Sequence, residues 1–307
     1  MRFTPDKPMK IGTRRSPLAM AQAQETVDRL ANATGADRDC FKLVPMSTKG
    51  DEITDRPLSD IGGKGLFTEE IEGALKSGSL DIAVHSMKDM PVLLPKGLCI
   101  DCFLPREDSR DAFVSLNYQS IADLPKGATV GSSSLRRRAQ LLARRPELQV
   151  VEFRGNVQTR LRKLGEGVAD ATFLACAGLN RLGISDHMTP IEMDEILPAI
   201  AQGVIGIERR ENDADVAALL EKINCKAAAV QMAAERAFLA GLDGSCQTPI
   251  AGHAVLNGNE ITLTGEVIRP DGSETIASTL TGATADAAKI GAELAKTLRK
   301  RMGEGFF

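Results

Sequence analysis

The stretch 81–91 carries the residue types best suited to chemistry. A short apolar run at 82–84 predicts a buried strand, and Met90-Pro91 ends the regular structure. Open α/β sheets bind ligands beyond the carboxyl ends of their strands. The polar residues in that position are His85, Ser86, Lys88 and Asp89.

Neighbours on an extended segment point to opposite sides, so Lys88 and Asp89 need not neutralise each other. Asp89 could therefore be a carboxylate directed into a cleft, where it would transfer protons. The alternative is a solvated turn in which Asp89 accepts hydrogen bonds from backbone N–H groups. The stretch alone leaves both interpretations open.

A second group of candidate residues is basic. The window 136–162 holds eight arginines against two glutamates, Glu147 and Glu152. It follows Gly131-Ser-Ser-Ser, a turn that predicts a helix N-terminus and so a site for anions. We expect Arg144 and Arg145 on a solvated helix face. We expect carboxylate or phosphate recognition, with nucleic acid as the rival ligand, from Arg136, Arg137, Arg154 and Arg160.

Two further segments point to anion binding. Arg14 and Ser16 flank a predicted helix that begins at Pro17, and its N-terminus favours negative groups. The polar, glycine-rich segment 47–65 is long enough to be a lid over a cleft. It ends in Gly-Gly-Lys64-Gly, which resembles a phosphate-binding turn but lacks the full P-loop pattern.

Of the six cysteines, Cys246 lies in the Gly/Ser loop 241–249, which favours a reactive thiol. A covalent anchor for a cofactor or an intermediate is one interpretation of such a residue. Cys99 and Cys102 form a C-x-x-C, but they fall on a strand-like run with no second pair, so we expect no metal site.

Composition limits the classes of function. The 307 residues are 43% hydrophobic, the net charge is −3, Trp is absent and Tyr118 is the single tyrosine. A chain without a basic field or aromatic platforms is a poor nucleic-acid binder. No stretch has the length of a membrane span and the N-terminus has no signal-peptide core, so we expect a cytoplasmic protein.

Strands and helices alternate up to about residue 220, which predicts α/β lobes built on parallel sheets. A charged connector at 105–110 is a candidate hinge, and a later strand is expected to return to the first lobe. We predict a discontinuous domain 1 (1–104 with 204–222), domain 2 (109–199), and an α+β domain 3 (225–307) with a three-stranded antiparallel sheet. The first two would form a two-lobed plan like that of the periplasmic binding proteins, with the ligand in the cleft.

Several motifs then occur in one order along nearly the whole chain. They are Ile11-Gly-Thr-Arg-Arg-Ser-Pro-Leu-Ala19, Val84-His-Ser-Met-Lys-Asp-Met-Pro91, Gly131-Ser-Ser-Ser-Leu-Arg-Arg137, Arg154-Gly-Asn-Val157 with Thr159-Arg160, Ala177-Gly-Leu-Asn-Arg-Leu-Gly183 and Gly244-Ser-Cys-Gln-Thr-Pro249. In this set the chain resembles the porphobilinogen deaminase (hydroxymethylbilane synthase) family.

The resemblance implies a monomeric transferase of porphyrin, tetrapyrrole and heme biosynthesis. It would condense four porphobilinogen molecules head-to-tail, releasing ammonia, and free the linear tetrapyrrole by hydrolysis. It implies a dipyrromethane cofactor, made from the substrate itself and joined by a thioether to the loop cysteine, here Cys246. The carboxylate of the Lys-Asp pair, here Asp89, would be catalytic.

Each pyrrole carries acetate and propionate groups, so cationic and hydroxyl side chains suit the growing chain. Carried over position by position, the cofactor-binding residues are Cys246, Lys88, Arg136, Arg137, Ser134, Ser86 and Asp89. The substrate-binding residues are Arg14, Ser16, Arg154, Arg160, Arg181, Ser133, Lys64 and Gln202.

Three positions depart from the family pattern. Ser245 and Ser132 stand where Gly and Thr are usual, and Asp60 occupies a lid position that is often basic. The competing class is a non-catalytic, two-lobed anion-binding protein. That class accounts for the sheets and arginines but not for Cys246 or the third domain.

Overall fold

The structure, a computed structural model, describes residues 2–48, 50, 68–244, 248–303 and 305–306. The chain forms two compact units. Unit 1 comprises Met1–Arg106 and Val204–Ala229, and unit 2 comprises Glu107–Gly203 and Val230–Phe307. A contiguous stretch of unit 2 thus interrupts unit 1. The predicted division of the chain into three domains stays a prediction.

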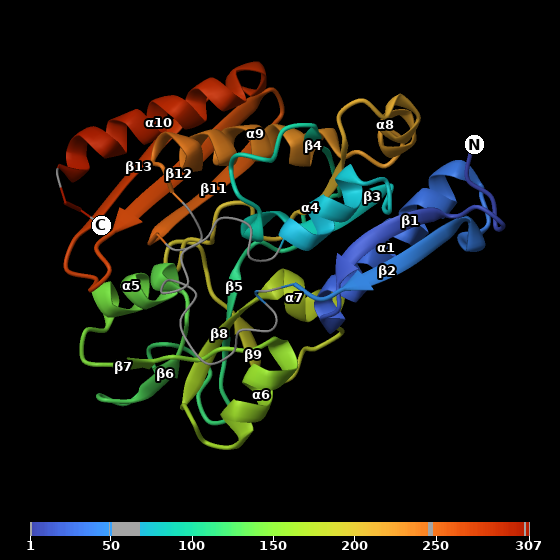
Figure 1. Ribbon diagram of the computed structural model, residues 1–307. Helices are drawn as coiled ribbons and strands as arrows, with labels where there is room; N and C mark the ends of the chain where they lie inside the picture. The colour runs from blue at the N-terminus through green and yellow to red at the C-terminus, as the bar shows by residue number, and fades with distance from the viewer. Residues whose placement is uncertain (1, 49, 51–67, 245–247, 304, 307) are drawn as a thin grey trace. The chain divides into compact units, whose positions relative to one another are not determined.

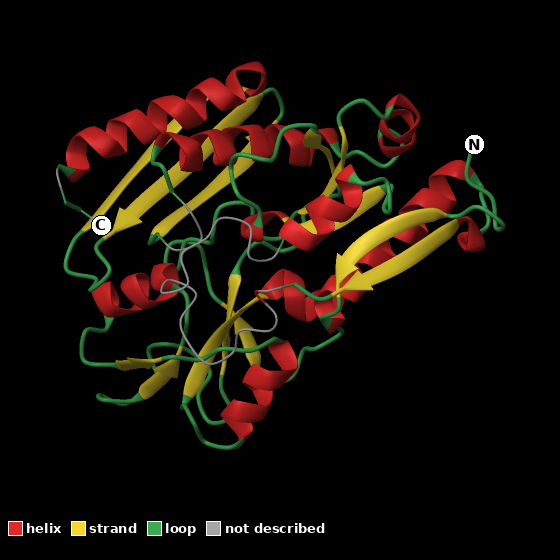
Figure 2. Ribbon diagram, in the orientation of Figure 1, coloured by secondary structure: helices red, strands yellow, loops and turns green. Residues whose placement is uncertain are grey.

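The helices are α1 (Pro17–Thr34), α4 (Glu69–Lys76), α5 (Leu135–Arg144), α6 (Val157–Gly165), α7 (Cys176–Arg181), α8 (Ala214–Leu220), α9 (Lys226–Gly241) and α10 (Ala287–Met302). Short 3-10 helices span η1 (Arg38–Cys40), η2 (Met87–Asp89) and η3 (Thr284–Asp286). None of the helices within the described ranges is long and apolar enough to span a membrane. Figure 2 distinguishes these helices from the strands.

The strands of unit 1 are β1 (Met9–Arg14), β2 (Phe41–Met46), β3 (Ile82–Ser86), β4 (Leu98–Phe103) and β10 (Ile205–Arg210). Those of unit 2 are β5 (Asp111–Val114), β6 (Thr129–Gly131), β7 (Gln149–Val151), β8 (Ala171–Ala175), β9 (Met188–Pro190), β11 (Ile250–Asn257), β12 (Glu260–Ile268) and β13 (Thr275–Ala283). Figure 1 labels these strands along the chain, except β10.

The sheet of unit 1 has the order β2-β1-β3-β10-β4. Strands β1, β2 and β3 are parallel, but β10 runs antiparallel to both β3 and β4. The expectation of a parallel sheet was therefore wrong. The first large sheet of unit 2 repeats the plan in the order β7-β6-β8-β5-β9, with β5 antiparallel to β8 and β9. Both exceptional strands, β10 and β5, come just after the chain passes from one unit to the other.

Alternation along β3 sends its side chains into two cores. Ile82 and Val84 belong to the core that contains residues of α1 and α8, whereas Ala83 packs with Ile71 and Leu75 of α4. The sheet is therefore covered on both faces, as expected for central parallel strands. The carboxyl ends of β1 and β3 lie at the same edge, next to the beginning of α1.

Residues adjacent in sequence determine where α1 begins and ends. The Ser16 hydroxyl caps the first turn, Pro17 opens the helix, and Gly35 follows in the left-handed conformation (φ 67°) that glycine adopts without strain. This start was predicted from the sequence and is confirmed. It fixes Arg14 and Ser16 on either side of the turn between β1 and α1.

The end of unit 2 is an antiparallel sheet in the order β11-β12-β13, as the sequence predicted. Helices α9 and α10 lie side by side along this sheet (Figure 1). They approach closely at Gly291, where a Cβ atom would collide with the carbonyl oxygen of Ala234. The predicted fold class, two α/β lobes with a small α+β domain, is confirmed.

The sequence missed some elements. Strand β9 and helix α8 were not predicted, and the predicted capping residue of the last helix, Thr284, lies instead in η3. Residues 87–89 form the 3-10 turn η2 rather than an extended segment. The last difference bears directly on the geometry of Lys88 and Asp89.

Candidate active site

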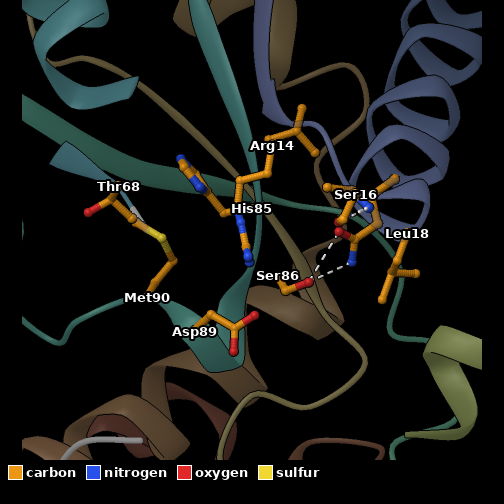
Figure 3. Close-up of a pocket in the computed structure, with 11 residues that line it drawn as sticks. Arg14, Ser16, Leu18, Thr68, His85, Ser86, Asp89 and Met90 are labelled. Atoms are coloured by element: carbon orange, nitrogen blue, oxygen red, sulfur yellow. Dashed lines mark hydrogen bonds between the residues drawn. The ribbon is translucent and has the colours of Figure 1, made fainter. Parts of the chain in front are cut away.

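A pocket in unit 1 lies at the carboxyl ends of β1 and β3. Figure 3 shows its residues: Arg14 from β1, Ser16 and Leu18 from the start of α1, His85, Ser86, Asp89 and Met90 from the end of β3 onward, and Thr68 from just before α4. The side chain of Arg14 extends from the strand toward Asp89 (Figure 3). Polar residues separated by some seventy positions in sequence thus line the same pocket.

Asp89 is the exposed residue of the η2 turn, and it lines the pocket. Lys88 is half-buried and does not line it. The two side chains therefore have different surroundings, but the extended segment that was expected to separate them is absent. The 3-10 turn separates them, because consecutive residues of a helix point in different directions.

Ser86 is held at the end of β3 by a residue of α1. Gln22 Nε2 donates to the Ser86 hydroxyl at 2.8 Å. The same hydroxyl donates to Gln22 Oε1 at 3.1 Å. Gln22 is buried, so its amide has a fixed position. The Ser16 hydroxyl accepts a hydrogen bond from Ala19 N at 3.3 Å. The N-terminus of α1 thus borders the pocket, and its dipole favours negatively charged groups there.

His85 lines the pocket from the face of β3 that packs against α4. Its Nε2 shares a 3.0 Å hydrogen bond with Oε2 of Glu208 on β10, and both side chains are buried. Glu72 on α4 is a third titratable group nearby. Burial raises the pKa of Glu72, and the charge of Glu208 adds to that effect. Behind the pocket, unit 1 therefore places a histidine between acidic groups.

In unit 2, the predicted anion-binding arginines of α5 form a buried cluster around Asp111. Arg137 donates from Nε at 3.2 Å and from Nη2 at 2.6 Å to Asp111 Oδ1, and Arg136 Nη2 lies 2.7 Å from Asp111 Oδ2. The Gln202 amide donates to Asp111 Oδ1 at 2.9 Å. Burial acts to raise the pKa of Asp111, but the two guanidinium groups hold it well below its ordinary value.

The remaining predicted residues of unit 2 lie near the beginnings of α5 and α6 and at the end of α7. Ser134 caps α5 by accepting from Arg137 N at 3.4 Å, and Ser133 accepts from Phe153 N at 3.1 Å. Arg160 donates to the Gly155 carbonyl oxygen at 2.9 Å. Arg154 is half-buried just before α6, and Arg181, at the end of α7, donates to the Gly203 carbonyl oxygen at 3.2 Å.

Some predictions fall outside the described residues. They concern Lys64, Asp60, Ser245, Cys246 and most of the lid segment 47–65. Ser132, the third departure from the family pattern, is buried and accepts from Ser134 N at 3.2 Å. Among the residues that the structure describes, no group of three or more His, Cys, Asp or Glu side chains could hold a metal ion.

Sequence reasoning overlooked Gln22 and Asp111. Each leaves a signal in the sequence: Gln22 is a polar residue on the buried face of an amphipathic helix, and Asp111 is an acid at the start of a buried strand. The expectation that Arg145 is solvated was wrong, since it is half-buried and donates to the Ile121 and Leu124 carbonyl oxygens and to Glu147. Its long side chain thus binds the backbone of the segment 121–124.

Comparison with known proteins gives a uniform result. The family domain described as "Porphobilinogen deaminase, dipyromethane cofactor binding domain" matches residues 9–218, and "Porphobilinogen deaminase, C-terminal domain" matches residues 229–300. The chain is similar to the porphobilinogen deaminases of Paracoccus denitrificans, with 61% identity over 99% of this chain and 97% of the relative, and of Nitrobacter winogradskyi, with 54% identity over 97% and 94%.

Among solved structures, the chain is similar to the periplasmic aliphatic sulphonate binding protein from Escherichia coli. The identity is 14%, the TM-score is 0.43, and the match covers 95% of this chain and 88% of that one. This last likeness concerns the fold alone. Because two family domains match in order and the curated relatives match over nearly their full length, the chain belongs to the porphobilinogen deaminase family.

Proposed function

We propose that the protein condenses four porphobilinogen molecules head-to-tail, with release of ammonia, into the linear tetrapyrrole hydroxymethylbilane. Membership of the family supports this activity over the alternative of a non-catalytic anion-binding protein. The single observation in the structure that favours it is the placement of Asp89. This carboxylate lines a pocket together with Arg14 and Ser86, so an acid–base group adjoins groups that bind carboxylates.

The residues present fit a dipyrromethane group. Such a group carries several carboxylates, and both units offer guanidinium, hydroxyl and helix N-terminal donors, the types that bind carboxylates. When bound, it supplies the primer to which the first porphobilinogen is joined. The residues that would hold it are Cys246 as covalent anchor, with Lys88, Arg136, Arg137, Ser134, Ser86 and Asp89.

Asp89 would manage the protons of each condensation. The C–N bond of the substrate's aminomethyl group breaks, and the nitrogen leaves as ammonia once it holds an additional proton. The remaining azafulvene is cationic, and a carboxylate beside it stabilises that charge. The new C–C bond forms at a pyrrole carbon, which then loses its proton to a base. Exposure of Asp89 to solvent lets it release protons between cycles.

The substrate's carboxylates need separate partners. In unit 1 we assign them to Arg14 and Ser16, because both border the pocket that contains Asp89. In unit 2 the corresponding candidates are Arg154, Arg160, Arg181, Ser133 and Gln202. Lys64, in the predicted lid, completes the proposed set.

The decisive experiment combines two readouts. Purified protein is incubated with porphobilinogen and assayed for ammonia, and its intact mass is compared with that of Cys246→Ser. We expect ammonia release, and a wild-type mass excess of two linked pyrrole units that the variant lacks. Absence of ammonia from protein that carries this excess would refute the activity. The same excess on the variant would refute the anchor.

We further propose that the protein acts in the cytoplasm and as a monomer. All the assigned residues belong to one chain, so the proposed site requires no second copy. Sedimentation of the purified protein tests the monomer, and fractionation of the source cells tests the location.

A further inference from the structure

The cluster around Asp111 has more positive than negative charge. Two guanidinium groups, those of Arg136 and Arg137, face the single carboxylate of Asp111. All three side chains are at most 7% exposed. Buried charges are normally compensated, because transfer of an ion out of water is strongly unfavourable. The cluster is thus one negative charge short.

The hydrogen-bond donors show the same deficit. A guanidinium group has five N–H donors. Arg136 donates to the Leu197 carbonyl oxygen at 2.7 Å and forms an ion pair with Asp111 Oδ2, but its Nε and that Oδ2 are both buried without a hydrogen-bond partner among the described residues. Arg137 places its Nη1 on the Phe173 carbonyl oxygen at 2.8 Å and its other nitrogens on Asp111. Buried donors of this kind usually have partners.

One neighbouring carboxyl group could complete the cluster, but it does not. Glu266 on β12 is close enough to influence the pKa of Arg136. Its Oε1 has no hydrogen-bond partner in the described part of the chain, and burial raises its pKa, which favours the uncharged form. Arg144 on the same helix adds positive charge near Glu266 rather than removing any.

Asp111 itself is held from a second side. Gln202 donates to Asp111 Oδ1 and also to the Ser109 carbonyl oxygen at 2.8 Å, so its amide ties the carboxylate to the backbone before β5. Asp111 is the first residue of β5, in the interior of its sheet. The carboxylate therefore has a fixed place, and the two guanidinium groups are oriented by it.

We propose that Asp111 is a positioning residue that supplies the first counter-charge to Arg136 and Arg137 and orients them for a second, a carboxylate of the dipyrromethane cofactor. This inference rests on the proposed function. The inference goes beyond the proposed function because it gives Asp111 a specific part in loading the cofactor. Asp111 is an internal carboxylate that does not touch the substrate. Without Asp111, a bound carboxylate would be the sole counter-charge of the pair.

The test compares the full-length chain, produced without porphobilinogen, before and after incubation with porphobilinogen. The intact mass and the melting temperature are measured for wild type, for Asp111→Asn and for a control, Asp170→Asn. Asp170 accepts a hydrogen bond from Thr129 N at 2.8 Å in the same lobe, so its substitution removes a hydrogen-bonded negative charge away from the cluster. The mass reports loading, and the melting temperature reports stability.

We expect Asp111→Asn to lower the melting temperature of the unloaded chain by roughly 6–12 °C. Loading should then raise the melting temperature of Asp111→Asn by at least about 3 °C more than it raises that of wild type, because the cofactor replaces the missing charge. In Asp170→Asn the increment should equal that of wild type. Equal increments in all three proteins would overturn the proposal, since a purely structural carboxylate affects both states alike.

If Asp111→Asn does not fold, Asp111→Glu replaces it, because that variant keeps the charge but displaces the carboxylate. An increment above that of wild type supports the proposal, and an equal one overturns it. Failure of the wild-type chain to gain mass would instead refute the proposed function. The two failures are therefore distinguishable.

Discussion

The two units hold their charged candidate residues in opposite ways. In unit 1, Asp89 is exposed on a short 3-10 turn, and the nearby Ser86 is held by the neutral amide of Gln22. In unit 2, Arg136 and Arg137 are buried and held by the ionised carboxylate of Asp111. The first arrangement is open to water, whereas the second excludes it.

The difference follows from what each kind of residue must do. A carboxylate that exchanges protons needs contact with solvent or substrate, and an exposed charge contributes little to stability. Guanidinium groups that recognise carboxylates gain strength from low dielectric and fixed geometry, but burial makes folding depend on their counter-ions. Activity and stability should therefore separate between the two units.

The largest expected effect is on turnover in unit 1. Asp89→Asn should lower the rate of ammonia release by about 100-fold or more, because it removes the acid–base group. Its melting temperature should match that of wild type, and its cofactor content, measured by intact mass, should fall less than its turnover. The matched control is Asp81→Asn, just before β3, where the carboxylate accepts from Lys10 N at 2.8 Å. Turnover of Asp89→Asn within threefold of wild type would contradict the assignment.

The next effect is on stability in unit 2. Arg137→Lys keeps the charge but loses the fork that contacts Asp111 and Phe173. We expect a loss of about 2–3 kcal/mol in the free energy of unfolding, measured by denaturant titration. Arg138→Lys, at the exposed next position of α5, should leave stability unchanged. If both variants lost equal stability, burial of the arginine would not be the cause.

A smaller effect is expected where unit 1 uses a neutral group. Gln22→Ala removes the two hydrogen bonds to Ser86 and should lower kcat/KM by roughly 5- to 30-fold, which corresponds to about 1–2 kcal/mol. Gln24→Ala, which removes a contact with Asp28 on the same helix, serves as control and should have little effect. The idea that Gln22 positions Ser86 would fail if both variants behaved alike.

The smallest expected effect concerns pH. The pKa of Asp111 in the folded protein lies below its ordinary value of about 3.9, so its ion pairs contribute fully above about pH 4. The difference in melting temperature between wild type and Asp111→Asn should therefore stay constant from pH 5 to pH 8. It should shrink progressively as the pH falls from about 4 toward the lowered pKa of Asp111. A difference that changed between pH 5 and pH 8 would show that another group titrates with the cluster.

The sequence predicted these two regions unequally. The turn before α1 and the strand before Asp89 follow from local signals: a capping serine, a proline and an apolar run. The burial of Arg136 could not be predicted in that way, because its partners are Asp111 and Leu197, far apart in sequence. The same holds for the direction of β10, since long-range pairing sets it.

The place of β10 also has a consequence for biosynthesis. This strand lies between β3 and β4, yet it begins at Ile205, whereas β4 ends at Phe103. At roughly 5–20 residues per second, a ribosome needs about 5–20 s to add the intervening residues. Throughout that interval β3 and β4 lack their common partner, while strands β5 to β9 are completed in sequence. The sheet of unit 1 should therefore be completed after the sheet formed by β5 to β9, although the first residues of unit 1 leave the ribosome earlier.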